Sequence, residues 1–259
     1  MNIVVCIKQV PGTTEIQIHP ETNTLVREGV ESIINPFDTY ALEEGVRLRE
    51  RFGGKVTVTT MGPPQADTAL REAISLGADE AVLFSDRVFA GSDTWATAYV
   101  LSRGLTKMGG YDLVILGKQT LDGDTGQVGP GLAEMLKLPF VAYVSRIDDI
   151  QDGRIRVQRM VEEGYETFEI QLPAIITVVK EINVPRVPSL RGSMKAKTAQ
   201  VPVWSAEEMG VDPDKAGIAG SPTRVVRIFF PKRERKSEML TGTLEEQVSA
   251  LADRLGETV

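Results

Sequence analysis

Short apolar runs alternate along roughly the first half of the chain with segments whose apolar positions recur at helical spacing. Ile3–Ile7 is a β-branched run, typical of a strand buried on both faces. A helix is expected from about residue 38 to 52, with Asp38 as its N-cap and Gly53-Gly54 as its stop. Similar patterns predict strands over 55–61, 81–84 and 111–116, and helices over 66–76, 94–107 and 125–136. This alternation predicts an α/β fold with a doubly wound, Rossmann-like parallel sheet.

The pattern changes after about residue 140. Residues 154–161 and 165–172 alternate around a turn at 162–164, which predicts an antiparallel hairpin and hence antiparallel edge strands. Another apolar strand is expected at 174–179, and a proline-punctuated segment with little periodicity follows it. We therefore expect an α/β domain over 1–200 and an extended C-terminal arm over 201–259.

The arm ends in a helical pattern whose apolar positions are Leu244, Val248, Leu251 and Leu255. This apolar face needs a covering surface. A partner chain is one candidate, and the chain's own domain is the other.

Composition narrows the class of protein. The 259 residues are 42% hydrophobic and carry a formal net charge of −7, which fits a globular domain and disfavours nucleic acid or an anionic membrane as a partner. We expect no transmembrane segment and a cytoplasmic location, because no apolar run is long enough to span a bilayer and no charged leader precedes the first strand. Cys6 and His19, each the single residue of its type, predict neither an internal disulfide nor a metal site.

A polar, glycine-rich segment over 117–130 follows the strand at 111–116 and precedes a helix. Free N–H groups at the start of that helix, together with the Thr125 hydroxyl, can hold an anion. The segment is not a P-loop, because Gln119 stands where Ser or Thr would follow Gly117-Lys118, and its glycine spacing is not the dinucleotide fingerprint. Taken alone, it is equally compatible with a solvated connecting loop.

Three segments should meet at the carboxyl edge of the sheet, where doubly wound folds bind ligands: residues 6–12, 61–64 and 117–127. Cys6, Met61 and Gly62 suit a flat base there, and the glycine-rich segment suits phosphates. Asp122 and Asp124 suit ribose hydroxyls or a helix cap, and a purely structural role is as well supported for each.

These features together resemble the beta subunit of electron transfer flavoproteins over nearly the whole chain. The resemblance is carried by 5–11 (VCIKQVP), 35–38 (NPFD), 62–63, 117–119, the Asp-rich loop to Gly129, and the hairpin region 157–177. It implies an alpha-subunit partner and a nucleotide site with no general base. The cofactor-binding residues so implied are Cys6, Asn35, Asp38, Met61, Thr94, Thr97, Gly117, Gln119, Asp122, Gly123, Asp124, Thr125, Gln127, Val128, Gly129 and Pro130.

The resemblance also implies a partner-recognition loop at about 183–197, in which Leu190 and Met194 contact a flavin-containing dehydrogenase. Leu190 is expected to be the exposed apolar anchor, since Pro188, Arg191 and Gly192 surround it. An ordinary buried leucine is the alternative. The arm and terminal helix would pack on the alpha subunit.

Two branches of this family differ in the ligand of the beta subunit. One binds AMP and the other, the electron-bifurcating branch, binds a second FAD. The chain is more similar to the bifurcating branch in 9–11 (QVP), in Ser92–Thr97 and in Gly123, where the missing Cβ lets a diphosphate approach the backbone. The implied activity is hydride transfer from NADH to FAD, with electrons passing to ferredoxin or flavodoxin and, through the alpha-subunit FAD, to a dehydrogenase acting on an acyl-CoA or 2-hydroxy acid.

Two alternatives stay open on the sequence. A non-bifurcating electron carrier with AMP in the same site needs the same loops. An ATP-binding module of the universal-stress type has a similar sheet, although it has no use for the 183–197 loop or for an uncovered terminal helix.

Overall fold

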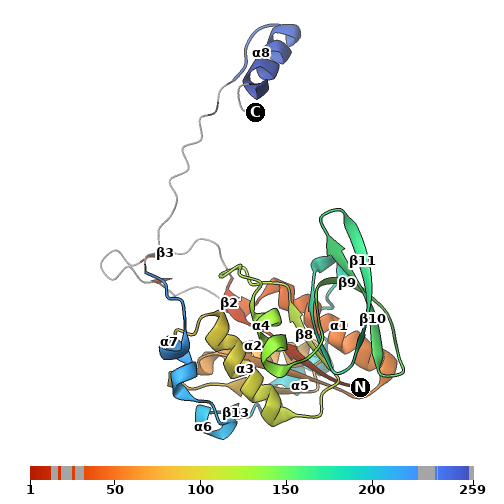
Figure 1. Cartoon of the computed structure of the whole chain (residues 1–259), viewed down its shortest axis with the longest axis vertical. Coiled ribbons are helices and arrows are strands. Elements are labelled where there is room, and N and C mark those ends of the chain that lie inside the picture. Colours follow the sequence, from red (N-terminus) through yellow and green to blue (C-terminus); the bar gives the residue numbers. More distant parts are fainter. Residues whose placement is uncertain (13–16, 19–24, 27–31, 227–236, 238, 257–259) are drawn as a thin grey trace. The chain divides into compact units, whose positions relative to one another are not determined.

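The computed structural model describes the chain except for residues 13–16, 19–24, 27–31, 227–236, 238 and 257–259 (Figure 1). It contains two compact units, Met1–Val225 and Val226–Val259.

The first unit is built on a nine-stranded sheet in the order β11-β10-β9-β12-β8-β1-β6-β7-β13. Its parallel members are β1 (Asn2–Cys6), β6 (Lys55–Met61), β7 (Glu80–Phe84), β8 (Leu113–Gly117), β12 (Ala174–Val178) and β13 (Val203–Trp204). β9 (Phe140–Gln151) pairs in parallel with β12, and β10 (Arg154–Val161) and β11 (Gly164–Gln171) add the antiparallel hairpin. The parallel sheet and the antiparallel edge predicted from the sequence are confirmed.

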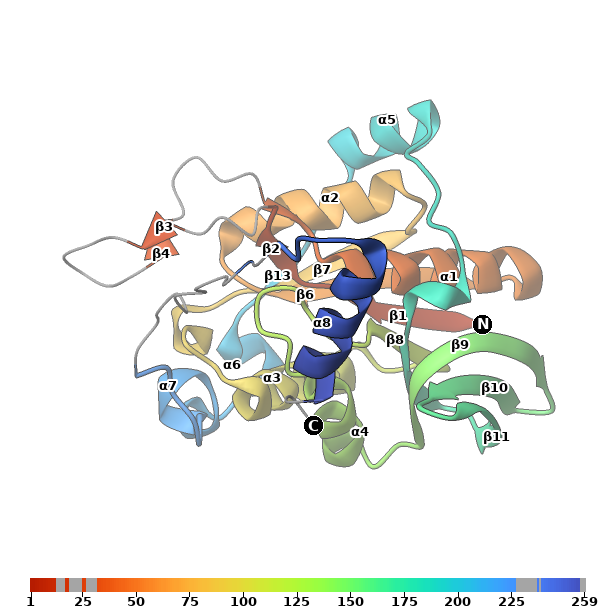
Figure 2. The same ribbon diagram turned by 90° about the horizontal axis from the view of Figure 1, so that it is seen from above.

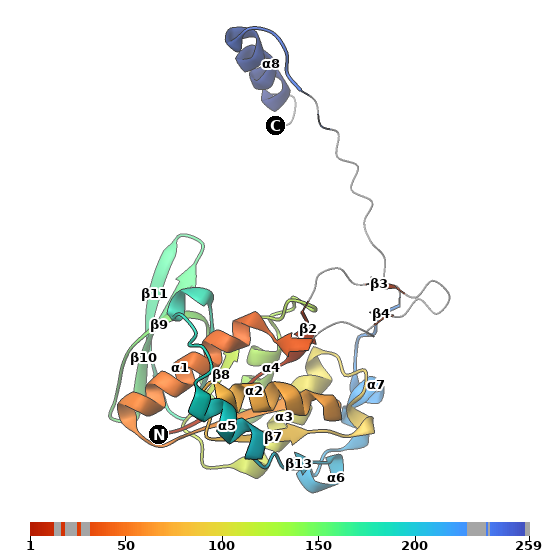
Figure 3. The ribbon, with the colours of Figure 1, turned by 180° about the vertical axis from the view of Figure 1, so that it is seen from behind.

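Helices cover both faces of this sheet. The side chains of β1 alternate between two cores, with Ile3 and Val5 in one and Val4 and Cys6 in the other. α1 (Pro36–Phe52) and α2 (Asp67–Ser75) pack on the first face, and α3 (Thr94–Met108) and α4 (Val128–Leu136) on the second. Figures 2 and 3 show these two helical layers on opposite sides of the strands. The near-continuous burial of β1 follows from this double coverage.

Two helix starts differ from the sequence prediction. Asn35, not Asp38, occupies the N-cap of α1, because Pro36 takes the first helical position and the Asp38 carboxylate points to the strand ends instead. α4 begins at Val128 rather than at Thr125, since Asp124 and Gly126 have φ angles of 52° and 63°, which a right-handed helix does not accept.

The segment after β12 contributes to the first unit further than expected. It contains α5 (Leu190–Thr198), α6 (Ala206–Met209) and α7 (Gly217–Gly220). β13 pairs with β7, and Ala206, Met209, Val211 and Ala216 are buried in the second core. This packing explains why the compact unit reaches Val225 instead of ending near residue 200.

Short elements complete the unit. They are the strand pairs β2 (Gln9–Pro11) with β5 (Ser32–Ile34) and β3 (Gln17–Ile18) with β4 (Leu25–Val26), and the 3₁₀ turns Pro64–Ala66, Arg87–Phe89, Lys180–Ile182 and Pro213–Lys215.

The described part of the second unit contains α8 (Leu244–Gly256). Thr243 and Glu246 cap its first turn reciprocally, the Thr243 N–H donating to Glu246 Oε2 at 2.7 Å. The four apolar positions predicted for one face, Leu244, Val248, Leu251 and Leu255, are each at least half exposed. The surface that covers them stays a prediction.

The sequence predicted neither a transmembrane segment nor a metal site. No helix in the described part of the chain combines the length and apolar character that crossing a bilayer requires. The same residues contain no group of three or more His, Cys, Asp or Glu side chains arranged to hold a metal ion, and His19 lies outside them.

Candidate functional site

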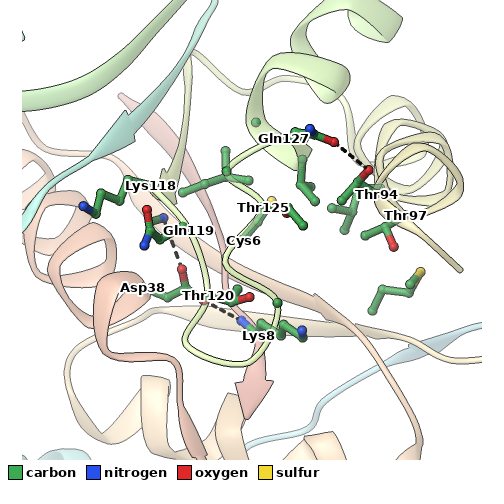
Figure 4. A pocket seen from close by; sticks show the side chains of 18 of the residues that line it. Cys6, Lys8, Asp38, Thr94, Thr97, Lys118, Gln119, Thr120, Thr125 and Gln127 are labelled. Atoms are coloured by element: carbon green, nitrogen blue, oxygen red, sulfur yellow. Dashed lines mark hydrogen bonds between the residues drawn. The ribbon is translucent and has the colours of Figure 1, made fainter. Parts of the chain in front are cut away.

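A cavity of about 330 Å³ lies at the carboxyl edge of the sheet, where the three predicted segments meet (Figure 4). We call it the strand-edge cavity. The ends of β1, β6 and β8 form its floor, the first turns of α3 form one wall, and the loop 117–127 forms the other. Its lining residues are Cys6, Ile7, Lys8, Asp38, Met61, Ser92, Asp93, Thr94, Thr97, Leu101, Leu116, Gly117, Lys118, Gln119, Thr120, Gly123, Thr125, Gly126, Gln127, Val128 and Gly129.

Asn35 anchors the loop 117–127 through two hydrogen bonds to its backbone. Its side chain is fully buried, its Nδ2 donates to the Gln119 carbonyl at 2.9 Å, and its Oδ1 accepts from the Leu121 N–H at 3.1 Å. Because both polar atoms are satisfied by the loop backbone, Asn35 shapes the cavity without lining it.

Asp38 ties together the ends of two strands. Its Oδ2 accepts from the Lys8 N–H at 2.7 Å and its Oδ1 from the Gly117 N–H at 3.2 Å. Burial raises the pKa of this carboxyl to about 7, although both backbone donors favour the charged form. A Cβ on Gly117 would overlap the Asp38 carboxylate and the Phe37 backbone, so only glycine fits at this crossing.

The two acidic residues proposed for the ribose do not line the cavity. Lys8 Nζ donates to both oxygens of Asp122 at 2.7 Å. Partial burial raises the pKa of Asp122, but the hydrogen bond and charge of Lys8 outweigh it, and the pKa falls below its ordinary value. Asp124 has a left-handed backbone and accepts a hydrogen bond from Gln119 Nε2. Both acids therefore shape the loop through other side chains.

Uncharged side chains in the lining of the strand-edge cavity suit a flat aromatic group. Burial raises the pKa of the Cys6 thiol to about 12, so Cys6 stays a neutral, apolar floor residue at neutral pH. Met61, Leu101 and Leu116 add further apolar surface.

The start of α3 supplies the polar part of its wall. Asp93 is its N-cap and accepts from the Trp95 and Ala96 N–H groups, each at 3.0 Å. Thr94 Oγ1 donates to Gln127 Oε1 at 3.3 Å, which links this wall to the loop (Figure 4). Thr97 lines the cavity three residues further along the same helix.

The start of α4 presents backbone donors of the kind that suit an anion. Gln127 at its N-cap makes no side-chain capping bond, and Val128 and Gly129 of the first turn line the cavity. First-turn N–H groups have no partner within a helix and favour negative charge. Space beside Gly123 is open as well, since only Thr120 Oγ1 lies within 4 Å of where a Cβ would stand. The donor set thus fits a phosphate group.

Most of the predicted cofactor residues come together in this cavity, but four do not line it. Those four are Asn35, Asp122, Asp124 and Pro130. The lining residues that were not predicted as cofactor-binding are Ile7, Lys8, Ser92, Asp93, Leu101, Leu116, Lys118, Thr120 and Gly126. Leu101 could have been predicted from helical spacing, because it lies four residues after Thr97 on the same helix face.

The predicted partner residues lie on a helix rather than a loop. Leu190 is 82% exposed and Met194 is 64% exposed, so Leu190 is not a buried core residue. The preceding segment is fixed to α1: Arg186 Nε pairs with the buried Glu43 at 2.8 Å and Arg186 Nη1 with Glu50 at 2.7 Å. The exposed apolar side chains of α5 therefore follow a segment that two ion pairs attach to α1.

Comparisons with known proteins agree with this arrangement. A family model described as an electron transfer flavoprotein domain matches residues 22–209. The electron transfer flavoprotein subunit beta of Thermoanaerobacterium thermosaccharolyticum is 51% identical, over 98% of each chain. The caffeyl-CoA reductase-Etf complex subunit CarD of Acetobacterium woodii is 48% identical, over 99% of this chain and 98% of its own. The protein FixA of Sinorhizobium fredii is 44% identical, over 98% of this chain and 92% of its own.

Proposed function

The chain belongs to the electron transfer flavoprotein family as a beta subunit, and on that basis we propose that the strand-edge cavity holds FAD and serves electron bifurcation. The observation that carries the proposal is the continuity of the cavity. It runs from the anion-binding start of α4, past Gly123, to Thr94 and Thr97 on α3. Its lining offers backbone donors suited to a diphosphate in one part, and hydroxyl and apolar side chains suited to a flat ring system in another.

The diphosphate would lie against the N–H groups of Val128 and Gly129, with the Thr125 hydroxyl as a further donor. Gly123 leaves room for close approach, because a Cβ there would occupy space that no protein atom other than Thr120 approaches. Lys8 forms an ion pair with Asp122 and so neutralises a carboxylate that would otherwise repel a phosphate nearby.

The ring end would lie between Met61 and the α3 wall, where Thr94 and Thr97 offer hydroxyl groups and Leu101 offers apolar contact. When bound, FAD would supply hydride acceptance from NADH and one-electron transfer to ferredoxin or flavodoxin and, through an alpha-subunit FAD, to a partner dehydrogenase. The protein's own part is to bind and orient the cofactor and to exclude water. No side chain is assigned as a general base.

Membership as a beta subunit implies an alpha-subunit partner. We propose that the alpha subunit covers the apolar face of α8 and that Leu190 and Met194 of α5 contact a flavin-containing dehydrogenase. The name of the Acetobacterium woodii relative joins such a subunit to a caffeyl-CoA reductase, which supports an acyl-CoA substrate for that dehydrogenase. A cytoplasmic location belongs to the same proposal.

AMP is the second candidate ligand. The anion site at the start of α4 and the floor at Cys6 and Met61 accept it equally well. It carries no isoalloxazine ring, so it gives no role to Thr97 and Leu101, which also line the cavity. The chain would then be the structural half of an ordinary electron carrier.

Ligand content distinguishes the two. We expect the chain copurified with its alpha partner to contain two FAD and no AMP, and NADH to bleach the flavin directly. One FAD with one extractable AMP, and no response to NADH, would support the second candidate.

A further inference from the structure

The carboxylate of Asp93 binds two segments that lie far apart in the sequence. Its Oδ1 accepts from the N–H groups of Trp95 and Ala96 and so caps α3. Its Oδ2 accepts from both the N–H and the hydroxyl of Thr223, at 2.9 and 2.8 Å. Four donors therefore converge on one side chain that also lines the strand-edge cavity.

Further hydrogen bonds attach the same late segment, residues 217–223, which we call the tail root. The Asp93 N–H donates to Ser221 Oγ at 2.8 Å, and the Gly217 N–H donates to Ser92 Oγ at 2.9 Å. α7, which begins the tail root, contacts α3 and lies beside it in Figures 1 and 2. The tail root is the last part of the first unit before the chain continues into Val226–Val259.

The ionised form of Asp93 is favoured by this arrangement. Partial burial raises the pKa of its carboxyl, but the hydrogen bonds from Ala96 and Thr223 outweigh that effect, and the pKa lies below its ordinary value. Charge-assisted hydrogen bonds of this kind are stronger than neutral ones. Loss of the Thr223 contact therefore weakens the hold on the cap of α3 as well as on the tail root.

The cap bears directly on the cavity wall. Thr94 and Thr97 are in the first turns of α3, and Thr94 also bonds Gln127 on the opposite loop. Thr223 is thus bonded to Asp93, and Thr94, the next residue along the backbone, is bonded to the glycine-rich loop.

We propose that Asp93 is a positioning residue that couples nucleotide binding in the strand-edge cavity to the order of the tail root. Binding of a nucleotide stabilises the Asp93–Thr223 contact, and that contact tightens nucleotide binding by the same factor, as linkage requires. The inference rests on the proposed function only in requiring that the cavity takes a nucleotide, whether FAD or AMP.

The test uses the full chain in complex with its alpha partner. Thr223→Val keeps the shape and the backbone N–H but removes the hydroxyl donor, whereas Thr223→Ser keeps the donor. Thr198→Val removes an exposed threonine hydroxyl that bonds Lys195 on α5, away from the cavity, and is the remote control. Dissociation constants for FAD and for AMP are measured separately, with amide exchange followed at Ala96 and at Ser221–Thr223.

Thr223→Val is expected to weaken binding of the resident nucleotide about three- to tenfold and to speed exchange at Ala96, as loss of one hydrogen bond to a charged group predicts. The two control variants should stay within about twofold of the parent chain. Adding nucleotide to the parent chain should slow exchange at Ser221–Thr223. Ser221→Ala, which removes the acceptor of the Asp93 N–H, should show a smaller change in the same direction.

The proposal is overturned if Thr223→Val binds nucleotide as tightly as the parent chain does. It is also overturned if nucleotide does not change the rate of amide exchange at the tail root. In either case Asp93 would only cap α3. Weaker binding without faster exchange at Ala96 would overturn the proposal too, since the effect would not pass through Asp93. If AMP alone binds, the FAD assignment fails while the coupling is still measured with AMP.

Discussion

The two walls of the strand-edge cavity are built differently. The wall formed by the loop 117–127 rests on Asn35 and Asp38, which are buried and bonded to backbone groups at the ends of β1 and β8. The α3 wall is held by the partly exposed side chains of Asp93 and Thr94, through contacts to Thr223 and Gln127. We call the loop wall the fixed wall and the α3 wall the adjustable wall, because buried hydrogen bonds open less readily than exposed ones.

The largest effect is expected on the fixed wall, at the place where the phosphate is proposed to lie. Gly123→Asp adds a side chain and a negative charge where only Thr120 now approaches. The purified complex should then lack the nucleotide of this subunit, as absorbance and extracted nucleotide would show. Gly153→Asp, in the β9–β10 turn, adds the same side chain and charge in open space away from the cavity; although its φ of 71° strains that turn, this control should keep the nucleotide. A Gly123→Asp protein with its full complement of FAD would show that the diphosphate lies elsewhere.

Removal of the buried support comes next. Asn35→Ala deletes two hydrogen bonds to the loop and leaves the Gln119 carbonyl and Leu121 N–H without partners, which should destabilise the chain by about 2–4 kcal/mol. Thermal unfolding measures this loss, and nucleotide content should fall with it. Thr39→Ala, at the start of the same helix, removes one hydroxyl contact with Pro36 and should cost much less. Equal losses in the two variants would contradict the supporting role of Asn35.

Asp38 predicts how stability depends on pH. Its pKa is about 7 in the folded chain and 3.8 as an ordinary carboxyl, so between these values the unfolded chain binds fewer protons. Stability from this group is therefore complete below about pH 4, falls as pH rises towards 7, at up to about 1.4 kcal/mol per pH unit, and is constant above that range.

Denaturant unfolding at several pH values would show this slope. Asp38→Asn should lower stability overall and abolish the slope, whereas Asp149→Asn, on the exposed part of β9, should keep it. A parent chain and an Asp38→Asn variant with parallel pH profiles would contradict the assignment.

The smallest effect is expected on the adjustable wall. Thr94→Val removes the contact with Gln127 at 3.3 Å between exposed groups, and should weaken nucleotide binding no more than about fivefold. Thr94→Ser keeps the hydroxyl and should bind as the parent does. An effect of Thr94→Val as large as that of Gly123→Asp would erase the distinction between the walls.

The sequence predicted the sheet well because burial on both faces leaves a clear apolar signature. β6 was predicted at its observed bounds, and the hairpin of β10 and β11 within one residue at each end. Helix starts were less accurate, since the choice between Asn35 and Asp38 as N-cap depends on a long-range contact with Lys8 and Gly117.

The partners of site side chains were harder to predict than the site itself. The sequence left Asp122 between a ribose contact, a helix cap and a structural role, and did not indicate its pairing with Lys8, 114 residues earlier. Nothing in the sequence near Asp93 indicates that Thr223, 130 residues later, shares its carboxylate. The boundary of the arm was placed too early because β13 is only two residues long and leaves little periodic signal.

The proposed role in bifurcation is tested by the nucleotide content of the chain copurified with its alpha partner, followed by a spectral titration with NADH. We expect two FAD per heterodimer, no AMP, and bleaching of the flavin by NADH. One FAD with one AMP, and a spectrum that NADH leaves unchanged, would contradict it.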